Sequence, residues 1–158
     1  LPFPQNPEAG FGAIAEDGST IILRNAVWNI SSSLMETIIE KQKAEIQRRI
    51  HILRRGRPFP DIEDRVVILI DDGIAMGSTM RASVKMCVKR RPANLIVAAP
   101  VGSPELARAL KKKEGVDKTV ILEKPKFFRA VAQEYEHWRD VPDYEVLEIM
   151  DQWRSEYA

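Results

Sequence analysis

The sequence predicts an α/β fold, in which a parallel sheet is flanked by helices. Three apolar runs, at residues 66–70, 95–101 and 116–122, are separated by segments with apolar residues at helical spacing. Strands that alternate with helices form right-handed βαβ units, which place the strands in one parallel sheet. The first run contains only Val, Ile and Leu. Such a run favours a strand that is buried on both faces of the sheet.

Turn and cap residues predict the remaining elements. Prolines at positions 2, 4 and 7 exclude a helix at the start of the sequence. Two short apolar runs flank turn residues at 16–19 and predict a hairpin over residues 11–23. Residues 31–55 predict a long helix with Ser32 or Ser33 as its cap. Further helices are expected after residue 79, over 104–113 and over 142–157.

The length of 158 residues fits a single domain with a full core. We expect three parts within it. Residues 1–60 hold the hairpin and the long helix, or hood, residues 61–125 hold the parallel βαβ core, and residues 126–158 hold an aromatic segment and a last helix.

Composition argues against several kinds of partner. The formal net charge of +1 gives no electrostatic case for nucleic acid. No apolar run approaches the ~20 residues that span a bilayer, and residues 1–10 lack the pattern of a signal peptide. The single cysteine, Cys87, excludes an internal disulfide and suits a reducing compartment, so we expect a cytoplasmic protein without a membrane partner. His51 and His137 lack partners at metal-ligand spacing, so we expect no metal site formed by side chains alone.

The candidate functional residues directly follow the first apolar run. Asp71 and Asp72 stand where the strand ends, which is where parallel sheets bind ligands. A loop of mostly small residues leads from there into the next helix and leaves backbone N–H groups free to hold an anion. The candidate anion-binding residues are Gly73, Ala75, Met76, Gly77, Ser78 and Thr79. Carboxylates beside such a loop suggest a sugar phosphate, whereas the simpler alternative is a strand-end turn with a helix cap.

The run from Val66 to Thr79 resembles the phosphoribosyl-pyrophosphate (PRPP) signature of type I phosphoribosyltransferases. In that signature, β-branched residues precede two acidic residues and a loop like Gly-Ile-Ala-Thr-Gly-x-Thr; Met76 departs from the usual Thr. Residues 6–18 and the Pro-rich and aromatic segments further along also look like a bacterial and archaeal family of predicted phosphoribosyltransferases. The resemblance spans most of the sequence, although only residues 66–79 are sharply diagnostic.

The resemblance implies a phosphoribosyltransferase-like, or Rossmann-like, fold and a reaction. Asp71 and Asp72 would be catalytic and hold the ribose hydroxyls, and the loop would hold the 5-phosphate. Mg²⁺ would be bound through PRPP, and ribose 5-phosphate would pass to a nitrogen acceptor with release of pyrophosphate. The acceptor base or amine stays open.

The resemblance also implies a further part of the family fold ahead of residues 6–18. In the family, a strand and a pyrophosphate-binding loop precede the segment that matches residues 6–18, whereas this sequence starts almost at that segment. We therefore expect the first βα unit to be absent. The alternatives are a subunit fragment or split gene product, a non-catalytic PRPP- or nucleotide-binding module, and a site that another subunit completes. Homo-oligomerisation would cover the sheet edge that the loss exposes.

Two further groups of residues carry weaker expectations. Arg54, Arg55 and Arg57 adjoin a Gly-Pro break and are candidate pyrophosphate contacts, although a solvated helix face is the alternative. The segment 127–138 is aromatic-rich and is either helical or a loop. Its rings either stack on a nucleobase or pack in the core.

Overall fold

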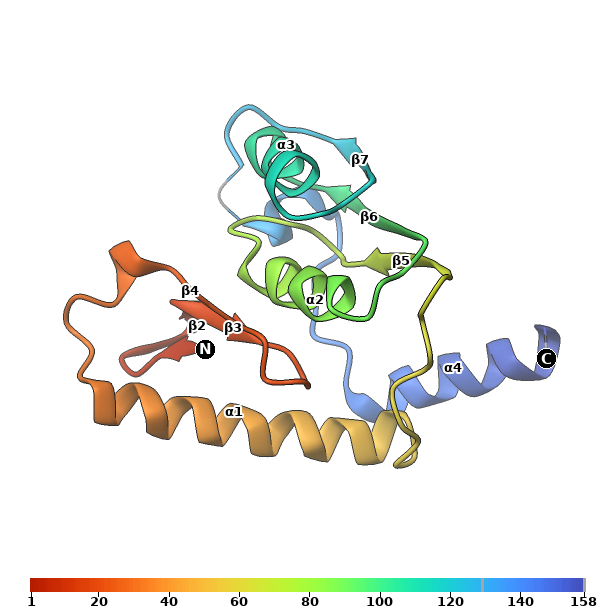
Figure 1. The fold of residues 1–158 in the computed structure, drawn as a ribbon, viewed down its shortest axis with the longest axis horizontal. Coiled ribbons are helices and arrows are strands. Elements are labelled where there is room, and N and C mark those ends of the chain that lie inside the picture. Colours follow the sequence, from red (N-terminus) through yellow and green to blue (C-terminus); the bar gives the residue numbers. More distant parts are fainter. Residues whose placement is uncertain (129, 158) are drawn as a thin grey trace.

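A three-stranded parallel sheet forms the centre of the computed structural model (Figure 1). The structure describes residues 1–128 and 130–157, apart from the side chains at positions 7, 8, 24, 112 and 113. The strands are β5 (Val66–Ile70), β6 (Asn94–Val101) and β7 (Lys118–Glu123), in that order across the sheet. Helices α2 (Ser78–Val88) and α3 (Pro104–Lys113) make the two crossovers. The alternation of strands and helices in the second half of the sequence is therefore confirmed.

The core lies between one face of this sheet and the two crossover helices. The register pairs Leu69 with Val97 and Ala99 with Ile121, so these side chains share the inner face. Val97 is fully buried there. Helix α2 contributes Cys87, which has 0% of its surface exposed and is a core residue.

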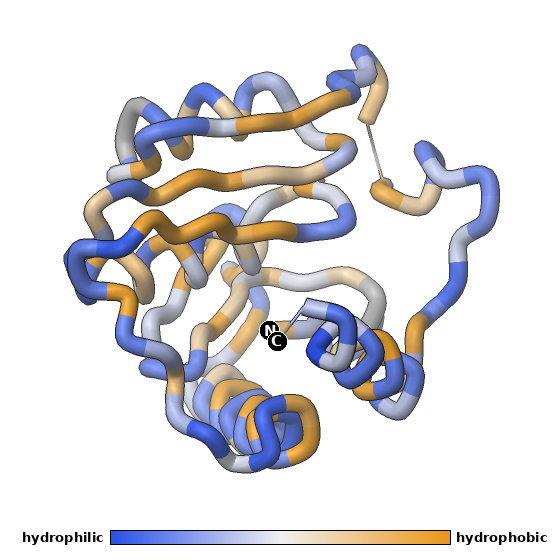
Figure 2. The backbone as a smooth tube through the Cα atoms, turned by 90° about the vertical axis from the view of Figure 1, so that its right-hand side faces the viewer, coloured by the Kyte–Doolittle hydropathy of each residue, from blue (hydrophilic) through white to orange (hydrophobic). Residues whose placement is uncertain are grey.

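The outer face of the sheet differs from the prediction. Strand β5 is buried on one face only, because Val66, Ile68 and Ile70 are 61%, 55% and 77% exposed. Val120 and Leu122 of β7 continue this exposed apolar surface. Figure 2 shows the three strands as largely apolar segments that lie side by side. Apolar composition predicts a strand that needs burial on both faces, but other elements decide whether the second face is covered. Within the described residues, α2 and α3 both pack against the inner face.

The segment 2–22 forms two antiparallel strand pairs. Strands β3 (Gly12–Ile14) and β4 (Thr20–Ile22) form the predicted hairpin, which packs against α2. Lys89, the residue that follows α2, holds the hairpin turn in place, since its Nζ donates to Asp17 Oδ2 at 2.9 Å and to Ser19 Oγ at 2.7 Å. The pair β1 (Pro2–Phe3) and β2 (Asn6–Gly10) was not expected from the sequence, and the 3-10 helix η1 (Arg24–Ala26) follows the hairpin.

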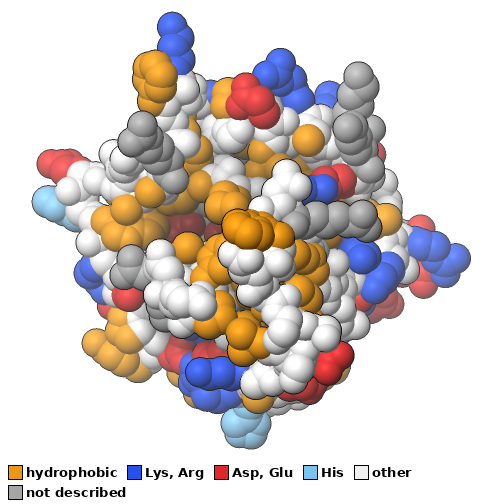
Figure 3. Space-filling view, turned by 90° about the vertical axis from the view of Figure 1, so that its left-hand side faces the viewer, with side chains coloured by type: hydrophobic (Ala, Val, Ile, Leu, Met, Phe, Trp, Pro, Cys, Tyr) orange, Lys and Arg blue, Asp and Glu red, His pale blue; other side chains and the backbone are white. Residues whose placement is uncertain are grey.

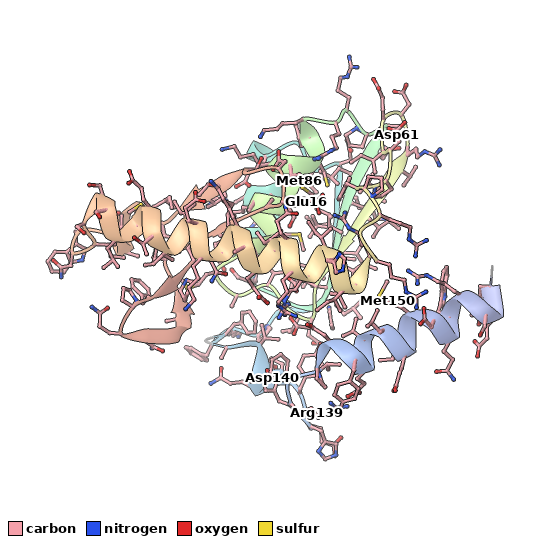
Figure 4. All side chains as sticks on the ribbon, turned by 90° about the horizontal axis from the view of Figure 1, so that it is seen from below. Glu16, Asp61, Met86, Arg139, Asp140 and Met150 are labelled. Carbon is pink, nitrogen blue, oxygen red and sulfur yellow. The ribbon has the colours of Figure 1, made fainter. Side chains whose placement is uncertain are left out.

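Two long helices lie below the sheet and the hairpin. Helix α1 (Ser32–Leu53) is capped by Ser31, whose Oγ accepts from Leu34 N at 3.3 Å, so the prediction of Ser32 or Ser33 as the cap was wrong by one or two residues. Helix α4 (Asp143–Tyr157) follows the short 3-10 helix η2 (Val131–Glu134). Figure 4 shows α1 crossing in front of the hairpin and α4 extending past its end. Among the described helices, none combines the length and the hydrophobicity that a bilayer crossing requires.

Candidate functional site

The acidic pair lies at the carboxyl end of β5, as predicted. The chain then turns towards β6, where Ile74 forms a parallel bridge with Gly102. Ile74 N donates to the Val101 carbonyl at 2.9 Å, and the Ile74 carbonyl accepts from Ser103 N at 3.2 Å. These two bonds fix the middle of the loop to the end of the neighbouring strand. The loop is thus part of the sheet edge where parallel sheets bind ligands.

Gly77 is the residue that turns the loop into α2. Its φ of 73° and ψ of 13° lie in the left-handed region, which glycine adopts without steric cost. Helix α3 also requires a glycine here, because a Cβ on Gly77 would lie 3.0 Å from Leu106 Cδ1 and still closer to Leu106 Cδ2. Both the backbone conformation and the packing against α3 therefore require glycine at position 77.

A row of backbone N–H groups surrounds the space in front of this turn. Within residues 1–128 and 130–157, no acceptor is found for the N–H groups of residues 75–79. Those of Ser78 and Thr79 belong to the first turn of α2, where an α-helix has no internal acceptors and its dipole favours negative charge. They border a pocket of about 230 Å³. The pocket is lined by Asp71, Gly73, Ile74, Ala75, Met76, Gly77, Ser78, Thr79, Met80 and Val131.

The two carboxylates differ in their surroundings. Asp71 is partly buried and its Oδ1 accepts from Asp72 N at 3.2 Å, whereas Asp72 is exposed. Burial raises the pKa of Asp71 above its ordinary value, and the neighbouring charge of Asp72 raises it further. Figure 3 views this end of the molecule and shows acidic atoms at the bottom of a recess that hydrophobic side chains border. The pocket therefore combines the carboxylate of Asp71 with the backbone N–H groups of residues 75–79.

The segment after β7 closes one side of the pocket, which the sequence did not predict. Val131 packs over Gly73, where an added Cβ would lie 2.5 Å and 2.7 Å from its two methyl carbons. The Tyr135 hydroxyl donates to the Asp72 carbonyl at 2.7 Å. The sequence marks this segment only by its aromatic content, because the contact joins residues 63 positions apart.

The three candidate arginines make contacts away from this pocket. Arg54 pairs with Glu16 of the hairpin at 3.0 Å, and Arg55 pairs with Asp151 of α4 at 2.5 Å. Arg57 donates to the Arg54 carbonyl at 3.3 Å. All three follow the last turns of α1, which lie near the start of β5, whereas the signature loop follows its end (Figure 1). These contacts favour a structural role, and a pyrophosphate contact for these arginines stays a prediction.

The aromatic segment is not part of the core. Phe127 is 89% exposed and Trp138 is 46% exposed, so the alternative of core packing is wrong for both. Among residues 130–138, the only helical stretch is η2. Stacking of these rings on a nucleobase stays a prediction.

The described residues contain no group of three or more His, Cys, Asp or Glu side chains that could hold a metal ion. Mg²⁺ commonly binds through one or two carboxylates together with substrate phosphates. Asp71 and Asp72 therefore fit a metal that arrives with a phosphorylated substrate, and Mg²⁺ remains an expectation.

Comparison with known proteins finds two similar curated proteins and a similar solved structure. No family model matches the chain. Two curated Mycobacterium tuberculosis proteins are 31% identical over 160 residues: "Putative phosphoribosyl transferase MT0597" (strain CDC 1551 / Oshkosh) and "Putative phosphoribosyl transferase Rv0571c" (strain ATCC 25618 / H37Rv). The match covers all of this chain and 36% of each relative, so the chain spans about a third of their length. The crystal structure of TT1426 from Thermus thermophilus matches 96% of this chain and 72% of its own chain, with a TM-score of 0.67 and 32% identity.

Proposed function

We propose that this chain, which belongs to the family of TT1426 and is 31% identical to two proteins named putative phosphoribosyl transferase, binds PRPP at the signature loop. The chain would transfer ribose 5-phosphate to a nitrogen acceptor and release pyrophosphate, as type I phosphoribosyltransferases do. The observation that carries this proposal is the row of N–H groups at residues 75–79 beside the partly buried carboxylate of Asp71.

Each part of the site suits one part of this substrate. The N–H groups of residues 75–79 would hold the dianionic 5-phosphate, which the dipole of α2 also favours. The carboxylates of Asp71 and Asp72 would accept hydrogen bonds from the ribose hydroxyls. A pocket of about 230 Å³ suits a phosphate with part of a ribose better than a whole nucleotide.

The proposed chemistry depends on charge and position. The bond from the anomeric carbon to the pyrophosphate oxygen breaks, pyrophosphate leaves with the electron pair, and the acceptor nitrogen bonds to the carbon with inversion. Asp71 and Asp72 would add negative potential beside the oxocarbenium-like carbon, and the fixed loop would keep the sugar in line with the acceptor. Mg²⁺, when bound with PRPP, would neutralise the pyrophosphate oxygens.

We further propose that the sheet is incomplete in this chain and that a first βα unit belongs beside β5. The described structure exposes 10967 Å². A compact monomer of 18.0 kDa would expose about 8,000 Å². The exposed apolar face of β5 and β7 accounts for part of the excess. A parallel sheet is normally covered on both faces, so a further polypeptide segment or a second copy would cover this one.

A non-catalytic binding module is the second candidate function. The pocket lining contains no lysine or arginine among the described residues, so nothing in it would neutralise departing pyrophosphate. Such a module would bind PRPP or a nucleotide through the same loop and perform no transfer. The groups that are missing for catalysis would come from another chain segment or subunit.

The test combines binding with turnover. Calorimetry with PRPP and Mg²⁺ measures binding, and pyrophosphate release across a panel of bases and amines measures transfer. Binding with turnover supports the enzyme, binding alone supports the module, and the absence of PRPP binding rejects both.

Matched variants show whether the acidic pair carries the binding. The double variant Asp71→Asn with Asp72→Asn should weaken PRPP binding by about 10- to 100-fold, since hydrogen bonds to charged groups are worth roughly 1.5–3 kcal/mol. Asp61→Asn is the control, because Asp61 stands before β5 and its Oδ1 accepts from Glu63 N at 3.1 Å, which Asn can also do. Equal PRPP affinity in both variants would contradict the assignment.

A further inference from the structure

We infer that the segment Val131–Tyr135, called the strap here, positions the acidic turn for the ribose, with Tyr135 as a positioning residue. This inference rests on the proposed function, because it concerns the same sugar-phosphate site. It adds two residues that the signature does not contain and assigns them an effect on the sugar part of the ligand.

The first observation is that the strap contacts both residues that the Asp72–Gly73 peptide bond joins. Tyr135 Oη donates to the Asp72 carbonyl at 2.7 Å, which fixes the oxygen of the peptide that joins Asp72 to Gly73. On the next residue, the methyl carbons of Val131 occupy the space where a Gly73 side chain would begin. The peptide plane that follows the acidic pair is therefore held by a hydrogen bond and by packing.

The second observation is that the strap is itself held in place. The ring of Tyr135 packs edge-on against Trp138, with centroids 5.2 Å apart and planes at 62°. Gln133 of the strap is also held, because its Oε1 accepts from the N–H of Ala130, the residue before the strap, at 3.3 Å. Tyr135 is thus limited in the positions that its hydroxyl can take.

The third observation separates the strap from the phosphate part of the site. Val131 is the one pocket-lining residue of the described chain that comes from outside residues 71–80. The N–H groups of residues 75–79 are fixed by other contacts, namely the Ile74 bridge to Gly102 and the packing of Gly77 against Leu106. Loss of the strap contact should therefore disturb the carboxylates that face the ribose and leave the phosphate cradle in place.

The experiment compares two probes on the same protein. Backbone-amide NMR titration measures the affinities of ribose 5-phosphate and of inorganic phosphate for the wild-type chain and for Tyr135→Phe. The variant removes one hydroxyl and keeps the ring that packs on Trp138. We expect about fivefold weaker ribose 5-phosphate binding, as for one lost hydrogen bond. Inorganic phosphate binding should stay unchanged. The ratio of the ribose 5-phosphate affinity to the inorganic phosphate affinity should therefore fall, which general destabilisation of the fold would not cause.

Tyr144→Phe is the matched control. Tyr144 is 66% exposed on α4, and its hydroxyl makes no hydrogen bond within the described residues, so both affinities should equal those of the wild type. If Tyr135→Phe does not fold, Val131→Ala removes the packing over Gly73 and should show the same selective loss.

The outcomes separate the two proposals. If the wild-type chain binds neither probe, the proposed function and the strap both fail. If it binds both probes but Tyr135→Phe loses them equally, or loses neither, the strap is overturned and the proposed function stands. Selective loss of ribose 5-phosphate supports the strap.

Discussion

The contact between the signature loop and α3 makes a strong prediction about Gly77. Replacing Gly77 by alanine places a Cβ in the left-handed region at φ 73°, which costs about 1 kcal/mol or somewhat more. The same Cβ would overlap the end of the Leu106 side chain, and overpacking of this kind costs roughly 1–3 kcal/mol. We therefore expect Gly77→Ala to lower the free energy of unfolding by about 2–4 kcal/mol in urea denaturation.

Gly18 provides a control that separates the two costs. It also has a positive φ, of 81°, but a Cβ there would meet nothing within 4 Å. Gly18→Ala should lower the free energy of unfolding by about 1 kcal/mol, from backbone strain alone. Both variants lose the same flexibility of glycine in the unfolded chain, so that effect cancels in the comparison.

A double-mutant cycle then tests the contact directly. In the Leu106→Ala background the overlap is gone, and Gly77→Ala should cost no more than Gly18→Ala does. The reasoning is refuted if Gly77→Ala costs the same in both backgrounds, or if it is no more destabilising than Gly18→Ala in the wild-type chain. Either result would mean that the loop does not pack against α3 as described.

Three further predictions concern stability and reactivity. Asp71→Asn should raise the free energy of unfolding at pH 7, because burial and Asp72 disfavour the charged carboxylate. Urea denaturation against pH should show this gain shrinking as the pH falls through the raised pKa and vanishing below the ordinary 3.8, where the carboxyl is neutral in both states. Ile70→Thr should change the free energy of unfolding by less than about 1 kcal/mol, because the side chain is 77% exposed, whereas Val97→Ala should cost about 2 kcal/mol because Val97 is fully buried. Cys87 should resist thiol reagents in the folded chain and react only after unfolding, since it is fully buried and burial raises its pKa.

Local patterns predicted the signature loop well. The position of Asp71 after β5 and the small-residue turn into a helix depend on residues within a short stretch of sequence. Helix α2 begins at Ser78, slightly before the expected start after residue 79. The hairpin and the helix over 104–113 were predicted for the same reason, because turn residues and an N-terminal proline act locally. The prediction of the α1 cap failed by one or two residues, since three successive serines offer equivalent hydroxyls.

Contacts between distant segments were not predictable in this way. Nothing near Asp72 in the sequence indicates that the hydroxyl of Tyr135 reaches its carbonyl. The arginines after α1 were placed near the substrate by analogy, but the contacts of Arg54 and Arg55 depend on where the hairpin and α4 pack. Periodicity shows which face of an element is apolar, yet it does not identify the element that covers that face.

The exposed face of the sheet and the missing pyrophosphate site have one physical cause under our proposal. Strand β5 has a neighbour on one side only within the described residues, so its other edge offers unpaired backbone groups. A further parallel strand on that edge would end beside Asp71, because the carboxyl ends of parallel strands meet at the same edge of the sheet. The loop after such a strand would face the acidic pair, and a helix following it would cover apolar surface. One added segment would then both complete the sheet and supply the groups that bind pyrophosphate. A polypeptide that stabilises this chain by pairing with β5 should therefore also confer the turnover that a binding module alone would lack.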